Sequence, residues 1–268
     1  MHQHVLGTLK VGILVIGLGW QGRYVQEQCI LADIQVAATT TTGRDATIPF
    51  AFSTLVDLQD YKRLPEAQTI LLTFPLPTLE SPFLFADAYA KTHLSTPNMV
   101  LLGSTRVFDG NATWSDRHGP ATPDARFLIE EQFLSHGGCV LNLAGLHGGS
   151  RQMPNWIPRV AATKTALSAK GSLHLIHGVD VARLVIAVHG TFTPKERWIV
   201  TDMHVYDWWS LIFDWDTSEE RRQWVAELME STGQRALPRP TEKLGRALDS
   251  TETWHQFKLL PTKTLSRQ

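Results

Sequence analysis

A glycine-rich loop near the start of the chain has the residue types and spacing to hold phosphate groups. Its sequence, Gly17-Leu18-Gly19-Trp20-Gln21-Gly22, is G-x-G-x-x-G, and it directly follows an apolar, mostly β-branched run at residues 11–16. In that setting the first glycine permits a tight turn, the second lets the backbone approach a pyrophosphate, and the third lets the next helix pack on the strand. The N-terminus of that helix offers amide groups and a partial positive charge to the phosphates. The loop therefore predicts a dinucleotide site, and the alternative is a plain glycine turn.

The residues after the second expected strand distinguish between the two nicotinamide cofactors. Proteins that bind NAD usually place an acidic residue about 20 positions after the loop, where it binds the ribose 2′-hydroxyl. This chain has Thr39-Thr40-Thr41-Thr42-Gly43-Arg44 there, and Asp33 precedes the strand. Hydroxyls and an arginine suit a 2′-phosphate, which a carboxylate would repel. We expect NADP, with NAD second, and the alternative for Arg44 is a solvent-exposed loop residue.

Strand-like and helix-like segments must position this loop, and they alternate along the first half of the chain. Short apolar runs predict buried strands, and longer mixed runs predict helices. The alternation predicts parallel βαβ units, and hence an α/β fold: a Rossmann-type, doubly wound parallel sheet with a small C-terminal α/β cap. The expected strands are residues 11–16, 34–39, 69–74, 98–103, 139–143, 173–177 and 196–200, and the expected helices are 23–32, 82–93, 126–134, 179–188, 208–213 and 219–230.

Composition narrows the class of protein. The chain has 268 residues, of which 43% are hydrophobic, so it can fill a real core. Lysine and arginine number 25 and aspartate and glutamate 26, a balance that argues against binding nucleic acid or an anionic membrane surface. With no signal-like segment or long apolar run, we expect a soluble cytoplasmic protein whose partner is a small molecule, and a homodimer stays open. We expect a dinucleotide-binding domain at residues 1–150 and a C-terminal substrate region at 151–268 that interleaves with the sheet.

Four segments, in order, resemble the extended and atypical short-chain dehydrogenases/reductases, in their NAD(P)-dependent epimerase/dehydratase-like branch. They cover residues 11–190, and Tyr206-Asp207-Trp208-Trp209 further along is similar to fungal members with no assigned function. The four segments are Gly17-Leu18-Gly19-Trp20-Gln21-Gly22, Gly103-Ser104-Thr105-Arg106-Val107-Phe108, Leu143-Ala144-Gly145-Leu146-His147-Gly148-Gly149-Ser150-Arg151 and Ile176-His177-Gly178-Val179-Asp180-Val181-Ala182.

The resemblance implies roles for particular residues. Ser104 stands where the family has its catalytic serine or threonine, residues 144–147 are expected beside the nicotinamide, and Arg151 is expected to contact substrate. Outside the glycine loop, the residues expected to contact the cofactor are Thr40, Arg44, Thr73, Phe74, Pro75 and Arg126.

One departure from the family concerns its proton donor. The family uses Tyr-x-x-x-Lys, in which the lysine lowers the pKa of the tyrosine and holds the nicotinamide ribose. Aligning the helix at residues 126–134 with the family places Thr122 at the tyrosine position and Arg126 at the lysine position. Threonine is far too weak an acid, and arginine can bind a ribose but stays charged. The four tyrosines, Tyr24, Tyr61, Tyr89 and Tyr206, are followed four residues later by Gln28, Pro65, His93 and Ser210.

Three functions therefore remain. The first is an NADP-dependent oxidoreductase acting on a small organic, bulky or aromatic substrate, in which His147 or Tyr206 supplies the proton. The second is a non-redox isomerase, dehydratase or cyclase on the same fold. The third is an inert protein that senses NADP. The oxidoreductase is supported by polar residues near the expected nicotinamide. The catalytic candidates among them are Ser104, His147 and Arg126.

The remaining candidates each have a structural alternative. His147 is either an acid–base group or a hydrogen-bonded surface histidine. Tyr206 and Trp209 belong to an aromatic segment that forms either a substrate wall or a helix packed in the core. His174 and His177 lack the spacing of a zinc site, and Cys29 and Cys139 lie 110 positions apart, so we expect no metal and no disulfide.

Overall fold

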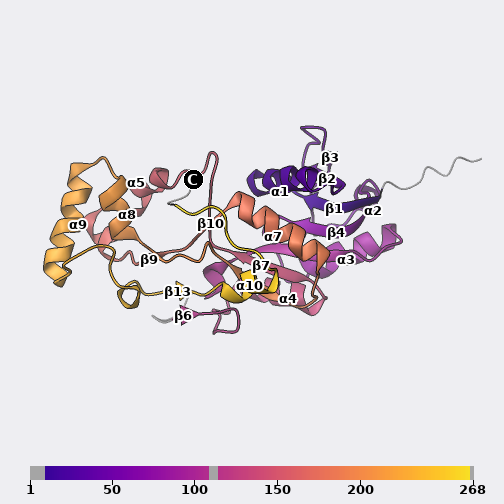
Figure 1. The fold of residues 1–268 in the computed structure, drawn as a ribbon. Helices are drawn as coiled ribbons and strands as arrows, with labels where there is room; N and C mark the ends of the chain where they lie inside the picture. Colours follow the sequence, from indigo (N-terminus) through magenta and orange to yellow (C-terminus); the bar gives the residue numbers. More distant parts are fainter. Residues whose placement is uncertain (1–9, 109–113, 266–268) are drawn as a thin grey trace, which may run out of the picture. The chain divides into compact units, whose positions relative to one another are not determined.

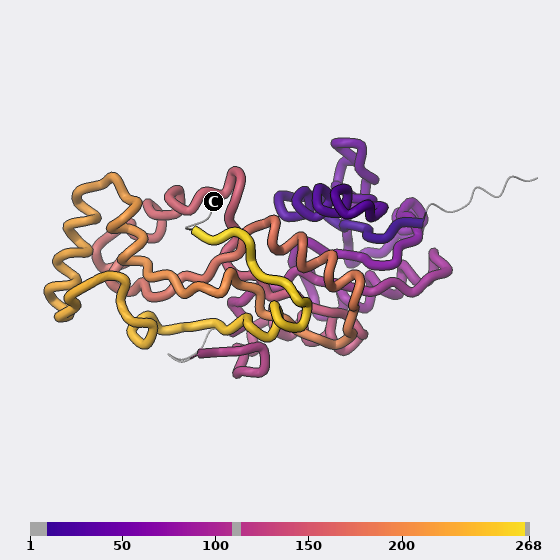
Figure 2. Tube along the Cα trace, viewed as in Figure 1, coloured from indigo at the N-terminus to yellow at the C-terminus, as the bar shows by residue number. Residues whose placement is uncertain are grey.

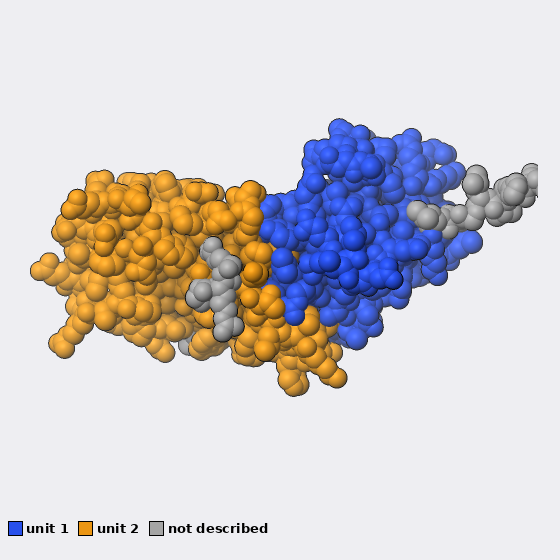
Figure 3. Space-filling model, turned by 45° about the horizontal axis from the view of Figure 1, so that its top comes forward, with its two compact units in different colours: residues 1–104, 123–142, 179–198 blue, residues 105–122, 143–178, 199–268 orange. Residues whose placement is uncertain are grey.

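The computed structural model describes residues 10–108 and 114–265, which divide into two compact units (Figures 1 and 3). The first unit takes its described residues from Met1–Ser104, Pro123–Asn142 and Val179–Trp198. The second takes them from Thr105–Thr122, Leu143–Gly178 and Ile199–Gln268. Each unit is built from several stretches of sequence, which can be followed by residue number along the trace in Figure 2.

A seven-stranded parallel sheet, most of whose residues belong to the first unit, has the strand order β11-β7-β5-β4-β1-β2-β3. Its strands are β1 (Lys10–Ile16), β2 (Val36–Thr40), β3 (Ile48–Pro49), β4 (Glu66–Leu72), β5 (Asn98–Ser104), β7 (Cys139–Leu143) and β11 (Arg197–Val200). Its helices are α1 (Trp20–Leu31), α2 (Leu58–Tyr61), α3 (Ser81–Thr92), α4 (Ala125–Ser135) and α7 (Gly178–Gly190). Figure 1 shows α1 and α7 on one face of the sheet and α3 and α4 on the other. The predicted Rossmann-type α/β sheet is therefore confirmed.

The strand order places a reversal of direction beside β1. From β1 the chain builds outward through β2 and β3, and then returns to place β4 on the other side of β1. The last paired residues of these two neighbours are Ile16 and Leu72. Ligands of open α/β sheets bind outside the carboxyl ends of the strands at such a switch point. The glycine loop follows β1 directly, so the fold puts it at this edge.

Apolar side chains between the sheet and α3 and α4 form one core of the first unit. Leu14, Ile70 and Leu72 of the strands pack there with Phe85 of α3 and Phe133 of α4, all of them buried. Strands buried on both faces need continuous apolar runs, which explains why β1 and β4 could be found in the sequence.

The second unit is built on short strands and aromatic helices. Its two-stranded sheets pair β8 with β10, β9 with β12, and β6 with β13. Trp208 and Trp209 of α8 are buried in its core beside Val225 of α9. The strands are β6 (Trp114–Ser115), β8 (Gly145–His147), β9 (Ser172–Leu173), β10 (Leu175–His177), β12 (Tyr206–Asp207) and β13 (Ala247–Leu248), and the helices are α5 (Ile157–Val160), α6 (Lys164–Ser168), α8 (Trp208–Trp215), α9 (Glu219–Thr232) and α10 (Thr251–Gln256).

One predicted strand is wrong. Residues 173–177 form two strands, β9 and β10, that pair with different partners, and His174 stands between them. The buried imidazole of His174 contacts the carbonyl oxygens of His204 and Arg246 at 3.2 and 3.3 Å. Burial lowers its pKa to about 4, so this ring stays neutral.

Candidate functional site

The first glycine of the loop forms a tight turn that is anchored to both neighbouring strands. Gly17 has φ +98°, a conformation that favours glycine, and a Cβ there would lie 2.7 Å from the Thr73 hydroxyl. The Gly17 amide donates to Thr39 Oγ1 at 3.0 Å, and the Leu18 amide donates to the Thr39 carbonyl at 2.7 Å. Thr73 Oγ1 contacts the carbonyl oxygens of Gly17 at 2.6 Å and Ile16 at 3.1 Å. Thr73 thus positions the turn from β4, and Thr39 does so from β2.

The other two glycines differ in their surroundings. A Cβ on Gly19 would have nothing within 4 Å, whereas a Cβ on Gly22 would lie 2.8 Å from the Gly17 carbonyl and 3.2 Å from Val15 Cγ1. Gly22 therefore lets α1 pack closely on β1, while Gly19 faces open space. These are the two arrangements that the third and second glycines of a pyrophosphate loop require.

The N-terminus of α1 is suited to an anion. Its N-cap is Gly19, which has no side chain to bond the first amides, and the first turn has no acidic residue. The amides of a first helical turn have no intrahelical acceptor, and the helix dipole makes this end positive. Trp20 packs edge-on against Tyr24, with ring centroids 4.8 Å apart, and Gln21 is buried. The residues present therefore fit a dinucleotide pyrophosphate.

The residues after β4 lie against the same turn. Phe74 approaches it closely, because a Cβ on Gly17 would be 3.3 Å from Phe74 Cδ1. Pro75 follows and lines a pocket of about 240 Å³ in the first unit. The structure thus brings Thr73 and Phe74 to the glycine turn, and their contact with a cofactor stays a prediction.

Charged side chains gather in the loop after β2. Arg44 is exposed, and its Nε lies 3.9 Å from Asp45 Oδ2, while Arg23 Nη2 lies 2.7 Å from the same oxygen. Thr40 ends β2, and its hydroxyl is 2.7 Å from that of Thr47. Sequence reasoning missed Arg23 and Asp45. Arg23 directly follows the third glycine and Asp45 directly follows Arg44, which is the signal that could have found them.

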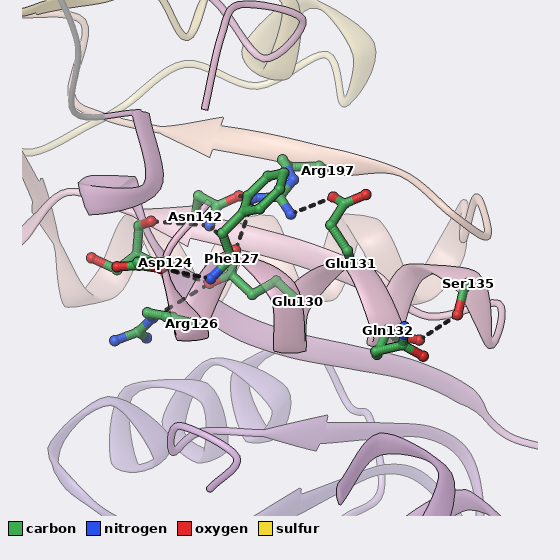
Figure 4. A network of polar contacts seen from close by, with 10 residues as sticks. Asp124, Arg126, Phe127, Glu130, Glu131, Gln132, Ser135, Asn142 and Arg197 are labelled. Atoms are coloured by element: carbon green, nitrogen blue, oxygen red, sulfur yellow. Dashed lines mark hydrogen bonds and ion pairs between the residues drawn. The ribbon is translucent and has the colours of Figure 1, made fainter. Parts of the chain in front are cut away.

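Ser104 ends β5, and its backbone is bound by a buried polar network. Figure 4 shows Glu130, Asn142 and Arg197 of that network. The Ser104 amide donates to Glu130 Oε1 at 3.4 Å, and the Ser104 carbonyl accepts from Asn142 Nδ2 at 3.1 Å. Glu130 Oε2 accepts from Asn142 at 2.8 Å and from Arg197 at 2.9 Å. Sequence reasoning missed Glu130, Asn142 and Arg197 entirely.

Glu130 is a buried carboxyl whose surroundings shift its pKa in opposite directions. Burial raises the pKa of its carboxyl, and the hydrogen bond from Asn142 and the positive charges of Arg197 and Arg126 offset this in part. Arg126 Nε lies 3.4 Å from Glu130 Oε1, one helical turn away on α4. Arg126 and Glu130 both line the 240 Å³ pocket.

His147 lies in the second unit, and the idea of a surface histidine was wrong. It ends β8, is 2% exposed, and pairs with His177 of β10. The two imidazole rings meet edge to face with centroids 5.1 Å apart. Gly148 follows with φ +115°, and a Cβ there would collide with the His177 ring, so only glycine lets the two histidines approach. Arg151 is exposed and pairs with Gly148 through backbone bonds.

Tyr206 and Trp209 also lie in the second unit. The Tyr206 hydroxyl donates to Asp202 Oδ2 at 2.6 Å, and this contact and burial raise the pKa of the phenol. Trp209 is buried, its Nε1 donates to the Leu167 carbonyl at 3.1 Å, and the Arg239 guanidinium lies 3.7 Å from its ring centroid. The indole therefore has the packing that a core aromatic shows.

The described part of the chain has neither a metal-binding cluster nor a membrane-spanning helix. Residues 10–108 and 114–265 contain no group of three histidine, cysteine or carboxylate side chains placed to hold a metal ion. None of the helices in those ranges is both long and apolar enough to cross a bilayer.

Solved structures share this architecture over nearly their whole length. Vestitone reductase from alfalfa superposes with a TM-score of 0.67 at 14% identity, covering 96% of this chain and 95% of that one. UDP-N-acetylglucosamine 4-epimerase from Bacillus cereus gives 0.64 at 12% identity, covering 95% of each chain. MoeE5 in complex with UDP-glucose and NAD gives 0.61 at 12% identity, covering 95% and 94%.

This chain has the fold of those reductases and epimerases. At such low identity the likeness establishes the fold alone. No protein-family model and no curated protein sequence matches the chain.

Proposed function

We propose that the chain binds NADP and acts as an atypical short-chain dehydrogenase/reductase on a small organic substrate. This proposal rests on one observation, which is that the three glycines of the loop have different structural roles. Gly17 makes the turn, Gly22 packs α1 on β1, and Gly19 leaves open space at an uncapped helix N-terminus. A plain glycine turn has no need of all three. The likeness to a fold that holds NAD in MoeE5 supports the same interpretation.

The residues of the first unit divide between the parts of the dinucleotide. The α1 N-terminus would hold the pyrophosphate, and Arg44, Arg23 and Thr40 would bind the 2′-phosphate. Bound NADP supplies a hydride donor or acceptor. Ser104 is our candidate for a hydroxyl that binds substrate oxygen, because its backbone is fixed on both sides by Glu130 and Asn142.

The proton donor separates the leading function from its alternatives. No tyrosine in the sequence is followed by a lysine four residues later, so a carbonyl reduction needs another acid. His147 stays the candidate that the sequence predicts, because an imidazole can transfer a proton near neutral pH. The same departure keeps two alternatives: a net non-redox isomerase, dehydratase or cyclase on the same fold, and an inert protein that senses NADP.

A substitution at Gly19 tests the proposal. Because a Cβ there meets nothing, Gly19→Ala should leave the fold intact while it keeps a pyrophosphate from the backbone. We expect NADPH to bind at least about tenfold more weakly, equivalent to about 1.4 kcal/mol, in a titration followed by nicotinamide fluorescence. Gly190→Ala is the matched control, because a Cβ at Gly190 also has nothing within 4 Å and Gly190 lies at the end of α7.

Two results would count against the proposal. The unaltered chain should bind NADPH, and no binding at millimolar concentration rejects the dinucleotide site. Equal affinities of the Gly19→Ala and Gly190→Ala proteins would move the site away from this loop. Turnover is then followed at the absorbance band of reduced nicotinamide with a panel of carbonyl compounds, and product formed without net cofactor change would select the non-redox alternative.

A further inference from the structure

The 240 Å³ pocket of the first unit is lined by apolar residues and by two charged residues. Five of its lining residues are apolar: Pro75, Leu76, Leu101, Leu102 and Ile129. The two others are Arg126 and Glu130, four positions apart on α4. The volume is below the roughly 300–1,000 Å³ of pockets for drug-sized ligands, so its ligand has a body the size of one ring or a short branched chain.

The Arg126 guanidinium contacts a carboxylate through its Nε, and within the described part of the chain its two Nη groups are open. Its Nε lies 3.4 Å from Glu130 Oε1, and the described residues give its two Nη groups no partner. The side chain is 36% exposed, so solvent can reach it. In Figure 4 the guanidinium points away from the rest of the network. A guanidinium is planar, and its two open Nη groups can donate parallel N–H···O bonds to the two oxygens of a carboxylate.

The charge of Glu130 does not close the pocket to an anion. Its Oε2 is bound by Arg197 at 2.9 Å and by Asn142 at 2.8 Å, so its charge is largely offset from the side away from Arg126. Arg197 also contacts Glu131 at 2.8 Å. The two arginines and two carboxylates of the network therefore balance in charge, and the Nη groups of Arg126 are the donors left open to an anion in the pocket.

We propose that this pocket binds a small apolar carboxylic acid, whose body contacts the leucine wall and whose carboxylate pairs with the open end of Arg126. A phosphate group fits less well, because the pocket offers one guanidinium and apolar side chains where phosphate sites gather several donors. We also assign this acid as the substrate, and that assignment rests on the proposed function. The binding site itself does not depend on the proposed function.

Matched probes test the charge and the shape of the ligand separately. Benzoate and 3-methylbutanoate carry the carboxylate, benzamide keeps the ring without the charge, and inorganic phosphate keeps the charge without the body. Each is titrated into the full chain, with and without saturating NADPH, and binding is measured by calorimetry. We expect benzoate or 3-methylbutanoate to bind, and benzamide and phosphate to bind at least about tenfold more weakly, as for the loss of a charge-assisted bidentate pair.

Substitution assigns the binding to Arg126. Arg126→Gln should weaken carboxylate binding about tenfold or more and leave benzamide unchanged. Arg63→Gln is the matched control, because Arg63 is also an exposed arginine paired with a carboxylate on its own unit, 3.2 Å from Asp60. Equal effects of the two substitutions would overturn the proposal.

The other outcomes separate this inference from the proposed function. Equal binding of benzamide or phosphate, or no binding of either acid, overturns the carboxylate site while NADPH binding stays intact. Acids that bind only when NADPH is absent would show that the pocket belongs to the cofactor, which also overturns the substrate assignment. Carboxylate binding without any NADPH binding keeps the pocket and rejects the proposed function.

Discussion

The loop after β2 provides a test of cofactor preference, because one carboxylate there is shared by two arginines. Asp45 Oδ2 lies 2.7 Å from Arg23 Nη2 and 3.9 Å from Arg44 Nε, and all three side chains are about half exposed or more. A 2′-phosphate entering this loop would compete with Asp45 for both arginines, whereas the 2′-hydroxyl of NAD could donate to Asp45. The proposed preference for NADP therefore depends on the two positive charges exceeding the single negative charge.

The magnitude follows from the exposure of these groups. A hydrogen bond to a charged group contributes about 1.5–3 kcal/mol, and solvent screening at this surface reduces that to about 1–2 kcal/mol. Arg23→Gln and Arg44→Gln should each weaken NADPH binding roughly 5- to 30-fold and leave NADH within about twofold. Asp45→Asn removes an exposed ion pair of about 0.2–1 kcal/mol, so it should strengthen NADPH binding by about fivefold at most and weaken NADH binding.

Fluorescence titration of each variant with NADPH and NADH gives the ratio of the two affinities. Repeating it at about 0.05 M and 0.5 M salt adds a check, since the preference for NADPH should fall as ions screen the surface charges. Arg63→Gln again controls for the general loss of a positive charge. If Arg23→Gln and Arg44→Gln lower both affinities equally, or if Asp45→Asn raises NADH affinity, the assignment of this loop to the 2′-phosphate is refuted.

Two further predictions concern the folded state. Gly103→Ala should lower the free energy of unfolding by roughly 1–3 kcal/mol, because its Cβ would lie 2.6 Å from both Asn142 Nδ2 and Glu130 Oε1, and an unchanged urea midpoint would contradict this. Burial raises the pKa of Asp202 to about 6, above the unfolded value of about 3.9, so the native state binds its proton more tightly and the free energy of unfolding should fall as pH rises from about 4 to about 6. Asp202→Asn should flatten that part of the urea-unfolding profile, and parallel profiles for the two proteins would refute the role of this carboxyl.

The first unit could be predicted well because its signals are local. β1, its glycine turn and α1 are specified by consecutive residues, and each glycine answers a constraint set by near neighbours in the fold. β5 and α3 have bounds within one or two residues of those expected, since apolar runs and a proline at the start of a helix mark their ends. The segment at 173–177 could not be resolved into two strands, because its division depends on partners at β8 and β12.

The polar contacts of the site could not be predicted, because their members are far apart in sequence. Arg23 and Asp45 are 22 positions apart, and they meet because Asp45 and Ala46 both take left-handed backbone conformations with φ +57°. Aspartate is one of the residue types enriched in this conformation but alanine is not, so the sequence does not predict the second left-handed residue, Ala46. Arg197 reaches Glu130 across 67 positions, through the strand order of the sheet.

The buried network also explains how this chain keeps Ser104 in place although α4 carries no tyrosine–lysine pair. Glu130 of α4 accepts from the Ser104 amide, and Asn142 of β7 donates to its carbonyl, so two rigid elements fix the end of β5. Gly103 allows this, since any Cβ there would displace both side chains. A site held by a helix and a strand is more precise than one held by a loop. The position of Ser104 therefore does not depend on the residue proposed to donate the proton, so a change of that donor need not disturb the rest of the proposed site.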